Sequence, residues 1–80
     1  MKTILVTGGS KGIGKALVFE AALNNYNIIF TYNKSTKEAK KICNKLKDKC
    51  TAIKVNLALE KDRAKLFNYL KKKKLILIVL

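Results

Sequence analysis

The stretch Thr7-Gly8-Gly9-Ser10-Lys11-Gly12-Ile13-Gly14 decides the fold of this 80-residue chain. It follows a short apolar run, Thr3-Ile4-Leu5-Val6, and it precedes apolar residues at helical spacing. Glycine permits a sharp turn and lets the backbone approach a ligand without a Cβ in the way. The first N–H groups of a helix that opens here, at the positive end of its dipole, would face phosphate oxygens. The order of strand, glycine loop and helix therefore predicts a site for the pyrophosphate of a dinucleotide.

The residues after the loop predict a helix with one buried face. That face is predicted to contain Ile13, Ala16, Leu17 and Ala21. The helix is expected to end at Asn24-Asn25, because Asn often replaces Gly at the left-handed position after a helix. A second strand at residues 27–32 completes a βαβ unit. A glycine turn without a ligand is the alternative, and the flanking strand and helix count against it.

The rest of the chain repeats the alternation. Ser35-Thr36-Lys37-Glu38 has the pattern of a capping box that starts a second helix. This helix is predicted to bury Ala39, Ile42, Cys43 and Leu46 and to expose its lysines. A third strand is expected at residues 51–55 and a third helix at residues 60–72, with Leu66, Phe67 and Leu70 on one face. The apolar run at residues 75–80 predicts a fourth strand of the kind that parallel sheets bury.

The loop is written Thr-Gly-x-x-x-Gly-Ile-Gly rather than Gly-x-Gly-x-x-Gly, and in this form it resembles the short-chain dehydrogenase/reductase family. Within that family it is most similar to the NADPH-dependent 3-oxoacyl-[acyl-carrier-protein] reductases. The resemblance continues through Tyr32-Asn33 and Val55-Asn56-Leu57 to the final apolar run. It implies the cofactor-binding part of an oxidoreductase that transfers hydride from NADPH to a 3-oxoacyl thioester in fatty-acid synthesis. The cofactor-binding residues predicted in this way are Gly8, Gly9, Ser10, Lys11, Gly12, Ile13, Gly14, Tyr32, Asn33, Lys34, Asn56 and Leu57.

The predicted fold is α/β, a Rossmann-type doubly wound parallel sheet with the element order βαβαβαβ and the strand order 3-2-1-4. The first two helices are expected on one face and the third on the other, where a single helix is too little to cover the sheet. Residues 1–80 are therefore expected to be the N-terminal part of an NAD(P)-binding Rossmann domain, truncated after the fourth strand.

The cofactor is predicted to be NADP(H) rather than NAD(H). An NAD-preferring site usually has an acid at the end of the second strand. This chain has Tyr32-Asn33-Lys34 there, and the first carboxylate after that strand is Glu38. Lys34 and Lys11 would attract a 2′-phosphate, and the resemblance implies that Lys11 stands where related reductases use Arg or Lys for this contact. The alternative is that both lysines are simply solvated in a lysine-rich chain.

No catalytic residue and no metal site is predicted. The resemblance implies that catalysis needs an Asn, a Ser and a Tyr-x-x-x-Lys pair beyond the fourth strand, so the chain is expected to be inactive alone. Tyr69 and Lys73 have the spacing of that pair, but they precede the fourth strand. The chain has no histidine and five acidic residues, and those acids form no metal-binding pattern.

Composition leaves two further functions open. The formal net charge is +13, which suits nucleic acid or an anionic surface, but the lysines are spread along the chain. Only Arg63 is an arginine and there is no Trp, so nucleic acid is expected to bind nonspecifically. The alternatives are a stand-alone nucleotide-binding or assembly module and, less favoured, a nucleic-acid-binding protein. An acyl carrier protein, implied by the resemblance, and a second copy paired at the fourth-strand edge are the expected protein partners.

A cytoplasmic location without membrane contact is expected. Lys2 is followed by too few apolar residues for a signal peptide. The final apolar run is far shorter than the ~20 residues that span a bilayer. Cys43 and Cys50 are expected to be small buried side chains rather than a disulfide or a metal pair.

Overall fold

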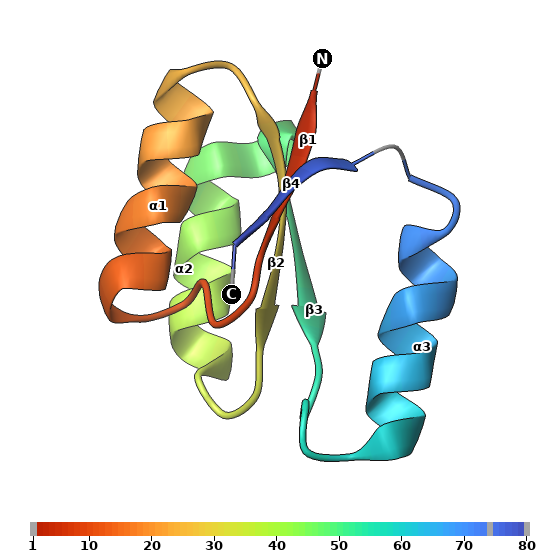
Figure 1. Cartoon of the computed structure of the whole chain (residues 1–80). Coiled ribbons are helices and arrows are strands. Elements are labelled where there is room, and N and C mark those ends of the chain that lie inside the picture. Colours follow the sequence, from red (N-terminus) through yellow and green to blue (C-terminus); the bar gives the residue numbers. More distant parts are fainter. Residues whose placement is uncertain (1, 74, 80) are drawn as a thin grey trace.

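The computed structural model describes residues 2–73 and 75–79, in which strands and helices alternate (Figure 1). The elements are β1 (Thr3–Val6), α1 (Gly12–Leu23), β2 (Asn27–Tyr32), α2 (Thr36–Leu46), the 3-10 helix η1 (Lys47–Lys49), β3 (Cys50–Lys54), α3 (Glu60–Leu70) and β4 (Leu75–Val79). β3 begins at Cys50 rather than at Thr51, and α3 ends at Leu70 rather than at Lys72. Leu80, predicted to close the fourth strand, lies outside the described residues. None of the helices in this part of the chain is long and apolar enough to cross a membrane.

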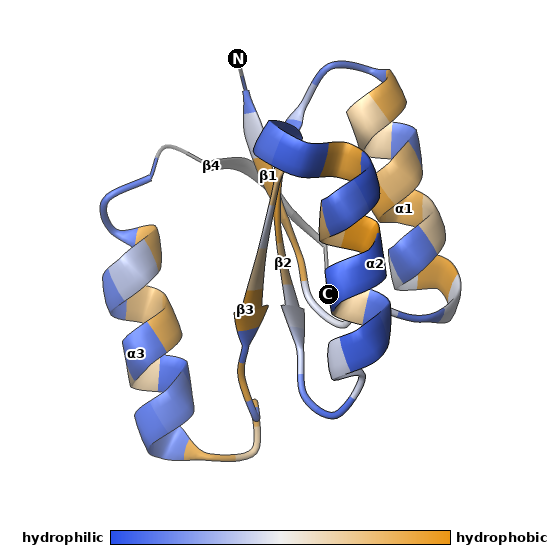
Figure 2. Ribbon diagram, turned by 180° about the vertical axis from the view of Figure 1, so that it is seen from behind, coloured by the Kyte–Doolittle hydropathy of each residue, from blue (hydrophilic) through white to orange (hydrophobic). Residues whose placement is uncertain are grey.

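Within the described residues, the strands form one parallel sheet in the order β3-β2-β1-β4. α1 and α2 cover one face of the sheet and α3 lies on the other (Figures 1 and 2). The fold is thus the predicted α/β class with a doubly wound parallel sheet. Parallel pairing brings the carboxyl ends of β1, β2 and β3 to one edge, and the loops that follow them meet there.

The main core lies between the sheet and the pair α1–α2. Alternate strand residues face this layer, as the two-residue period of a strand requires: Ile4 and Val6 on β1, and Ile28 and Phe30 on β2. The helices contribute Val18, Ala21, Ala22, Ala39 and Ile42, and Cys43 and Leu46 pack against them partly buried. The inward face predicted for α2 is therefore confirmed.

The face predicted for α1 is wrong except at Ala21. Ile13 is 82% exposed and Leu17 is 36% exposed, and Ala16 is exposed as well. The buried residues are instead Val18, Ala21 and Ala22. α1 carries hydrophobic residues on most of its turns (Figure 2), so its apolar spacing does not single out one face.

The ends of the helices agree with the sequence in one case and differ in another. Asn25, which comes after the C-cap residue Asn24, has a φ of 65°. This is the left-handed conformation predicted for an asparagine at the end of α1. Ser35 is the N-cap of α2, but its side chain makes no capping hydrogen bond, so the predicted capping box is not formed. Glu38, its expected partner, instead lies near the ammonium groups of Lys15 and Lys41.

α3, on the other face of the sheet, leaves some of its apolar side chains exposed. Leu66 is buried against the sheet, whereas Phe67 is 69% exposed. Both side chains and that of Leu70 line one pocket, so the three residues share a face of α3, as predicted. The apolar pocket beneath this helix has a volume of about 240 Å³ and is lined by Leu5, Thr7, Leu57, Arg63, Leu66, Phe67 and Leu70.

Cys43 and Cys50 are free thiols that lie partly buried at the contact between α2 and β3. Burial, with a smaller contribution from the neighbouring Cys43 thiol, raises the pKa of Cys50 to about 12. The Cys50 thiol is therefore protonated at neutral pH and behaves as a small apolar side chain, as the sequence predicts.

This raised pKa predicts a loss of stability at alkaline pH. The Cys50 thiol ionises more easily in the unfolded chain, so its contribution to stability is complete below about pH 9. It is lost as the pH rises through the folded-state pKa of about 12. Urea unfolding between pH 8 and 11 should therefore show a steeper loss of stability in the wild type than in Cys50→Ala. Parallel curves would contradict the prediction, because the lysines and tyrosines titrate in both proteins.

Candidate functional site

The glycine loop between β1 and α1 depends on two left-handed residues. Gly8 has a φ of 68° and Gly12 a φ of 54°, a region that costs residues with a Cβ about 1–2 kcal/mol. The loop turns at these positions from the carboxyl end of β1 into the first turn of α1. The spacing of the glycines thus follows from the backbone path.

The other two glycines are required by close packing. A Cβ on Gly9 would lie 2.6 Å from the Cβ of Phe30 and 3.0 Å from Cγ2 of Val18. A Cβ on Gly14 would collide with the carbonyl oxygen of Gly8. α1 therefore begins directly against the loop.

Thr31 holds the loop in place from the neighbouring strand. Its hydroxyl oxygen accepts a hydrogen bond from the Gly8 N–H (3.2 Å), and its carbonyl oxygen accepts one from the Gly9 N–H (3.1 Å). Thr31 is 2% exposed, so both bonds are shielded from water. Thr31 is not among the site residues predicted from the sequence, although a threonine that follows the apolar run Ile28-Ile29-Phe30 is a signal for a buried polar role.

The start of α1 presents backbone donors beside the loop. The first backbone hydrogen bond of the helix runs from the Lys15 N–H to the Lys11 carbonyl oxygen (3.1 Å). The N–H groups of Gly12, Ile13 and Gly14 therefore precede the hydrogen-bonded turns and lie at the positive end of the helix dipole. The first turn of α1 contains no acidic residue. Such a terminus can hold the pyrophosphate of a dinucleotide.

A pocket of about 260 Å³ opens beside the loop at the carboxyl edge of the sheet. It is lined by Gly8, Thr31, Tyr32, Asn33, Val55, Asn56, Leu57 and Ala58. The fold thus gathers three separate segments: the glycine loop, the end of β2 and the segment after β3. The pocket has apolar and amide groups side by side, which suits the adenosine half of a dinucleotide.

The segment after β3 is fixed by its own hydrogen bonds. The Asn56 side-chain oxygen accepts the Ala58 N–H (3.0 Å), and Asp62 Oδ2 accepts the Asn56 N–H (2.9 Å). Arg63 Nη1 donates to the Leu57 carbonyl oxygen (2.8 Å). Asp62 and Arg63 are not among the site residues predicted from the sequence. Asp62 stands in the first turn of α3, where an acid commonly bonds to backbone N–H groups.

Several predicted site residues do not line the pocket. Ser10 is buried in the loop, while Lys11, Ile13 and Lys34 are exposed around it. Lys11 is the N-cap of α1 and makes no side-chain capping bond, and Lys34 is the second residue after β2. Both lysines thus lie at element ends along the carboxyl edge of the sheet.

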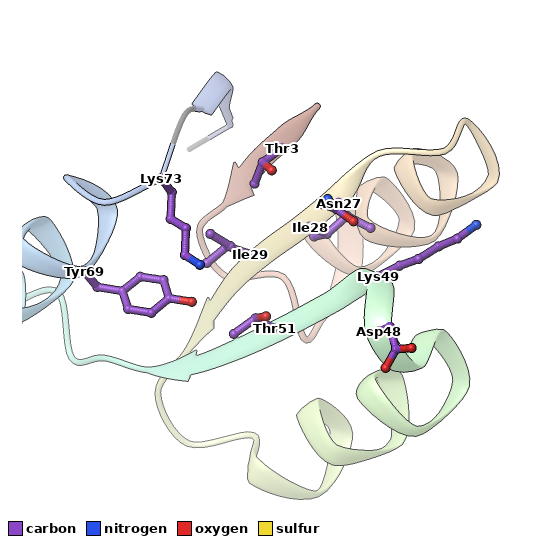
Figure 3. Close-up of a pocket in the computed structure, with 9 residues that line it drawn as sticks. All are labelled: Thr3, Asn27, Ile28, Ile29, Asp48, Lys49, Thr51, Tyr69 and Lys73. Atoms are coloured by element: carbon purple, nitrogen blue, oxygen red, sulfur yellow. The ribbon is translucent and has the colours of Figure 1, made fainter. Parts of the chain in front are cut away.

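Tyr69 and Lys73, which have the Tyr-x-x-x-Lys spacing, come from the end of α3 and the segment after it and point toward the sheet (Figure 3). They line a pocket of about 200 Å³ together with Thr3, Asn27, Ile29 and Thr51. None of the described residues that line this pocket lines the pocket beside the glycine loop. The structure thus places the pair away from the candidate dinucleotide site.

Solved structures share this fold. The E. coli protein BdcA (YjgI) is 30% identical, with a TM-score of 0.82 over 96% of this chain and 39% of that chain. A mutant short-chain dehydrogenase/reductase from Serratia marcescens is 27% identical, with a TM-score of 0.83 over 96% of this chain and 34% of that chain. A 3-ketoacyl-(acyl-carrier-protein) reductase from Brucella melitensis, solved in complex with NADH, is 20% identical and shows the fold alone, with a TM-score of 0.80 over 96% and 32% of the two chains.

This chain thus spans 32–39% of the length of these proteins. The sequence profile of the short chain dehydrogenases matches residues 2–80. That match covers the glycine loop, the adjoining pocket and the strands that position them, and it shows that the chain belongs to the short-chain dehydrogenase family.

Proposed function

We propose that this chain is the NADP(H)-binding part of a reductase of this family. The observation that carries this proposal is the glycine loop before α1. The loop is hydrogen-bonded to Thr31 and leads into the free N–H groups of the first helical turn, and Gly8 and Thr31 also line the adjoining pocket. The family binds nicotinamide dinucleotide cofactors. The residues present fit such a ligand, because the first turn of α1 offers backbone N–H groups without an acid and Gly8 lines the adjoining pocket without a Cβ.

The preference for the 2′-phosphate of NADP(H) rests on charges at the rim of the site. Tyr32 and Asn33, which end and follow β2, line the pocket without an acid, and the next residue is Lys34. Lys11 supplies a second cation at the start of α1. The Brucella reductase was solved with NADH, so the selectivity argument depends on the residues of this chain and not on that relative.

The reaction we propose is the reduction of a 3-oxoacyl thioester carried by an acyl carrier protein in fatty-acid synthesis. Its support is the resemblance of Thr7–Gly14 to the loops of such reductases. The chain is proposed to be inactive alone, because Tyr69 and Lys73, its Tyr-x-x-x-Lys pair, line a different pocket from the one beside the glycine loop. The free thiols Cys43 and Cys50 fit the reducing cytoplasm, which is the location we propose.

Assembly with a second copy is the other function that one observation favours. β4 stands at the end of the strand order, next to β1. An edge strand can pair with another chain. A dimer whose formation does not depend on a dinucleotide would favour this function.

A titration of the full chain with NADPH and NADH tests the proposal. Hydrogen bonds to charged groups contribute about 1.5–3 kcal/mol, so NADPH should bind roughly tenfold more tightly than NADH or better. Lys11→Ala/Lys34→Ala should remove this preference and leave NADH binding unchanged. The control Lys40→Ala/Lys65→Ala removes the same charge from exposed helical positions and should keep the preference.

Two results would contradict the proposal at different points. Equal affinities of the wild type for NADPH and NADH would exclude the assignment of Lys11 and Lys34 to a 2′-phosphate. No binding of either dinucleotide at millimolar concentration would exclude the dinucleotide site itself.

A further inference from the structure

Glu38 belongs to a cluster of charges that the expected capping role does not explain. Its Oε2 atom lies 3.4 Å from Lys15 Nζ on α1, which donates a hydrogen bond to it, and its Oε1 atom lies 3.9 Å from Lys41 Nζ on α2. The Lys15 and Glu38 side chains are 43% and 38% exposed, whereas that of Lys41 is 72% exposed. Lys15 is thus the closer and better shielded of the two cations around this carboxylate.

The Lys15–Glu38 bridge joins the two helix starts that flank the predicted phosphate site. Lys15 stands one turn after Lys11, the N-cap of α1, and a helix rises only about 1.5 Å per residue. Glu38 stands in the first turn of α2, four residues after Lys34. The bridge therefore connects the two segments that carry the lysines proposed to attract a 2′-phosphate.

Glu38 is also an acid whose negative charge would oppose that of the phosphate. The first turn of α1 contains no acidic residue, and that of α2 contains Glu38 alone. A phosphate monoester carries close to two negative charges at neutral pH, and charges within about 10 Å of each other are only partly screened at 0.1 M salt. A free carboxylate here would therefore weaken NADPH binding more than NADH binding.

We propose that Lys15 is a positioning residue for cofactor selectivity. By pairing with the Glu38 carboxylate, Lys15 offsets its negative charge, so that the carboxylate opposes less of the attraction between the 2′-phosphate and Lys11 and Lys34. This inference rests on the proposed function, because it requires a dinucleotide at the glycine loop. It assigns to Lys15 and Glu38 a role that an ordinary solvated ion pair on the surface would not have.

The test compares dissociation constants for NADPH and NADH in a double-mutant cycle at 20 mM and at 150 mM salt. Lys15→Gln should weaken NADPH binding about threefold to tenfold at low salt. The effect should be smaller at high salt, because screening shortens the distance over which the carboxylate charge repels the phosphate. NADH binding should change less than twofold, in line with the weak effect of most exposed charges. Lys15→Arg keeps the cation and should keep the selectivity. Lys41→Gln, the matched control from the longer contact, should have a smaller effect.

The second arm removes the carboxylate. In a Glu38→Gln background, Lys15→Gln should no longer alter the ratio of the two dissociation constants. Equal losses for NADPH and NADH, or an unchanged Lys15→Gln effect in the Glu38→Gln background, would overturn the inference while leaving the dinucleotide site intact. No binding of either dinucleotide to the wild type would overturn the proposed function and this inference with it.

Discussion

Replacing Gly14 by alanine is expected to destabilise the fold and to abolish dinucleotide binding in the same step. The new Cβ would collide with the carbonyl oxygen of Gly8 and lie 3.1 Å from the Cα of Gly9. Both obstacles are backbone atoms, so no side-chain rotation relieves the contact and α1 must move away from the loop. Overpacking of this kind costs about 1–3 kcal/mol, and the loss lowers Tm by roughly 4–8 °C per kcal/mol in a domain of this size.

The loss of binding follows from the same displacement. The donors at the start of α1 must point at one ligand position, and a shift of the helix relative to Gly8 misaligns them. Thermal melts followed by circular dichroism, together with an NADPH titration above the wild-type dissociation constant, measure both effects on one sample.

Gly12→Ala is the matched control for this experiment. No heavy atom lies within 4 Å of an ideal Cβ on Gly12, although its φ of 54° is left-handed. The substitution should therefore cost only the backbone strain of about 1–2 kcal/mol, and it should leave the contact between α1 and the loop intact. Equal binding losses in Gly12→Ala and Gly14→Ala would show that the loop conformation, and not the close approach of the helix, determines the site.

Much of the fold could be predicted because its signals are local. The glycine loop marks a strand-to-helix turn, and Asn25 marks the end of α1 by its left-handed backbone. Strands that alternate with helices admit few arrangements other than a parallel sheet with helices on both faces. Element type and order follow from such features without knowledge of any long-range contact.

The wrong predictions concern which side of a helix is buried. α1 is apolar on most sides, so its spacing does not identify Val18, rather than Leu17, as the residue that lies toward the sheet. The buried side depends on how the helix docks, and that information is not contained in its own sequence.

The candidate site likewise has one part that the sequence predicts and another part that depends on long-range contacts. The positions of Gly8, Tyr32, Asn33 and Asn56 around one pocket follow from the parallel sheet, which brings the carboxyl ends of its strands together. The bonds from the loop to Thr31 and from Asn56 to Asp62 join residues whose contact only the folded chain creates. Glu38 was assigned to a local cap for the same reason, since its partner Lys15 lies 23 positions away in the sequence.

Phe30→Ala is expected to produce the largest loss of stability. Phe30 is the largest fully buried side chain among the described residues, and it stands in the middle of β2 against α1 and α2. Removal of a buried Phe costs about 3–5 kcal/mol. Stabilities of about 0.05–0.15 kcal/mol per residue give a domain of this length little more than that. Most of the variant should therefore be unfolded at 37 °C, as far-UV circular dichroism would show.

Phe67→Ala supplies the matched control, because it removes the same side chain from a position that is 69% exposed. Exposed substitutions usually change stability by less than about 0.5 kcal/mol, so the urea midpoint should stay close to that of the wild type. The Cβ and Cγ atoms of Phe30 lie against Gly9, so removal of the ring and its Cγ loosens the support of the loop on the side that faces the core. A Phe30→Leu variant keeps both atoms and should therefore recover most of the stability together with the dinucleotide affinity. Equal shifts for Phe30→Ala and Phe67→Ala would instead place the main core under α3 and contradict the packing of α1 and α2 as the support of the loop.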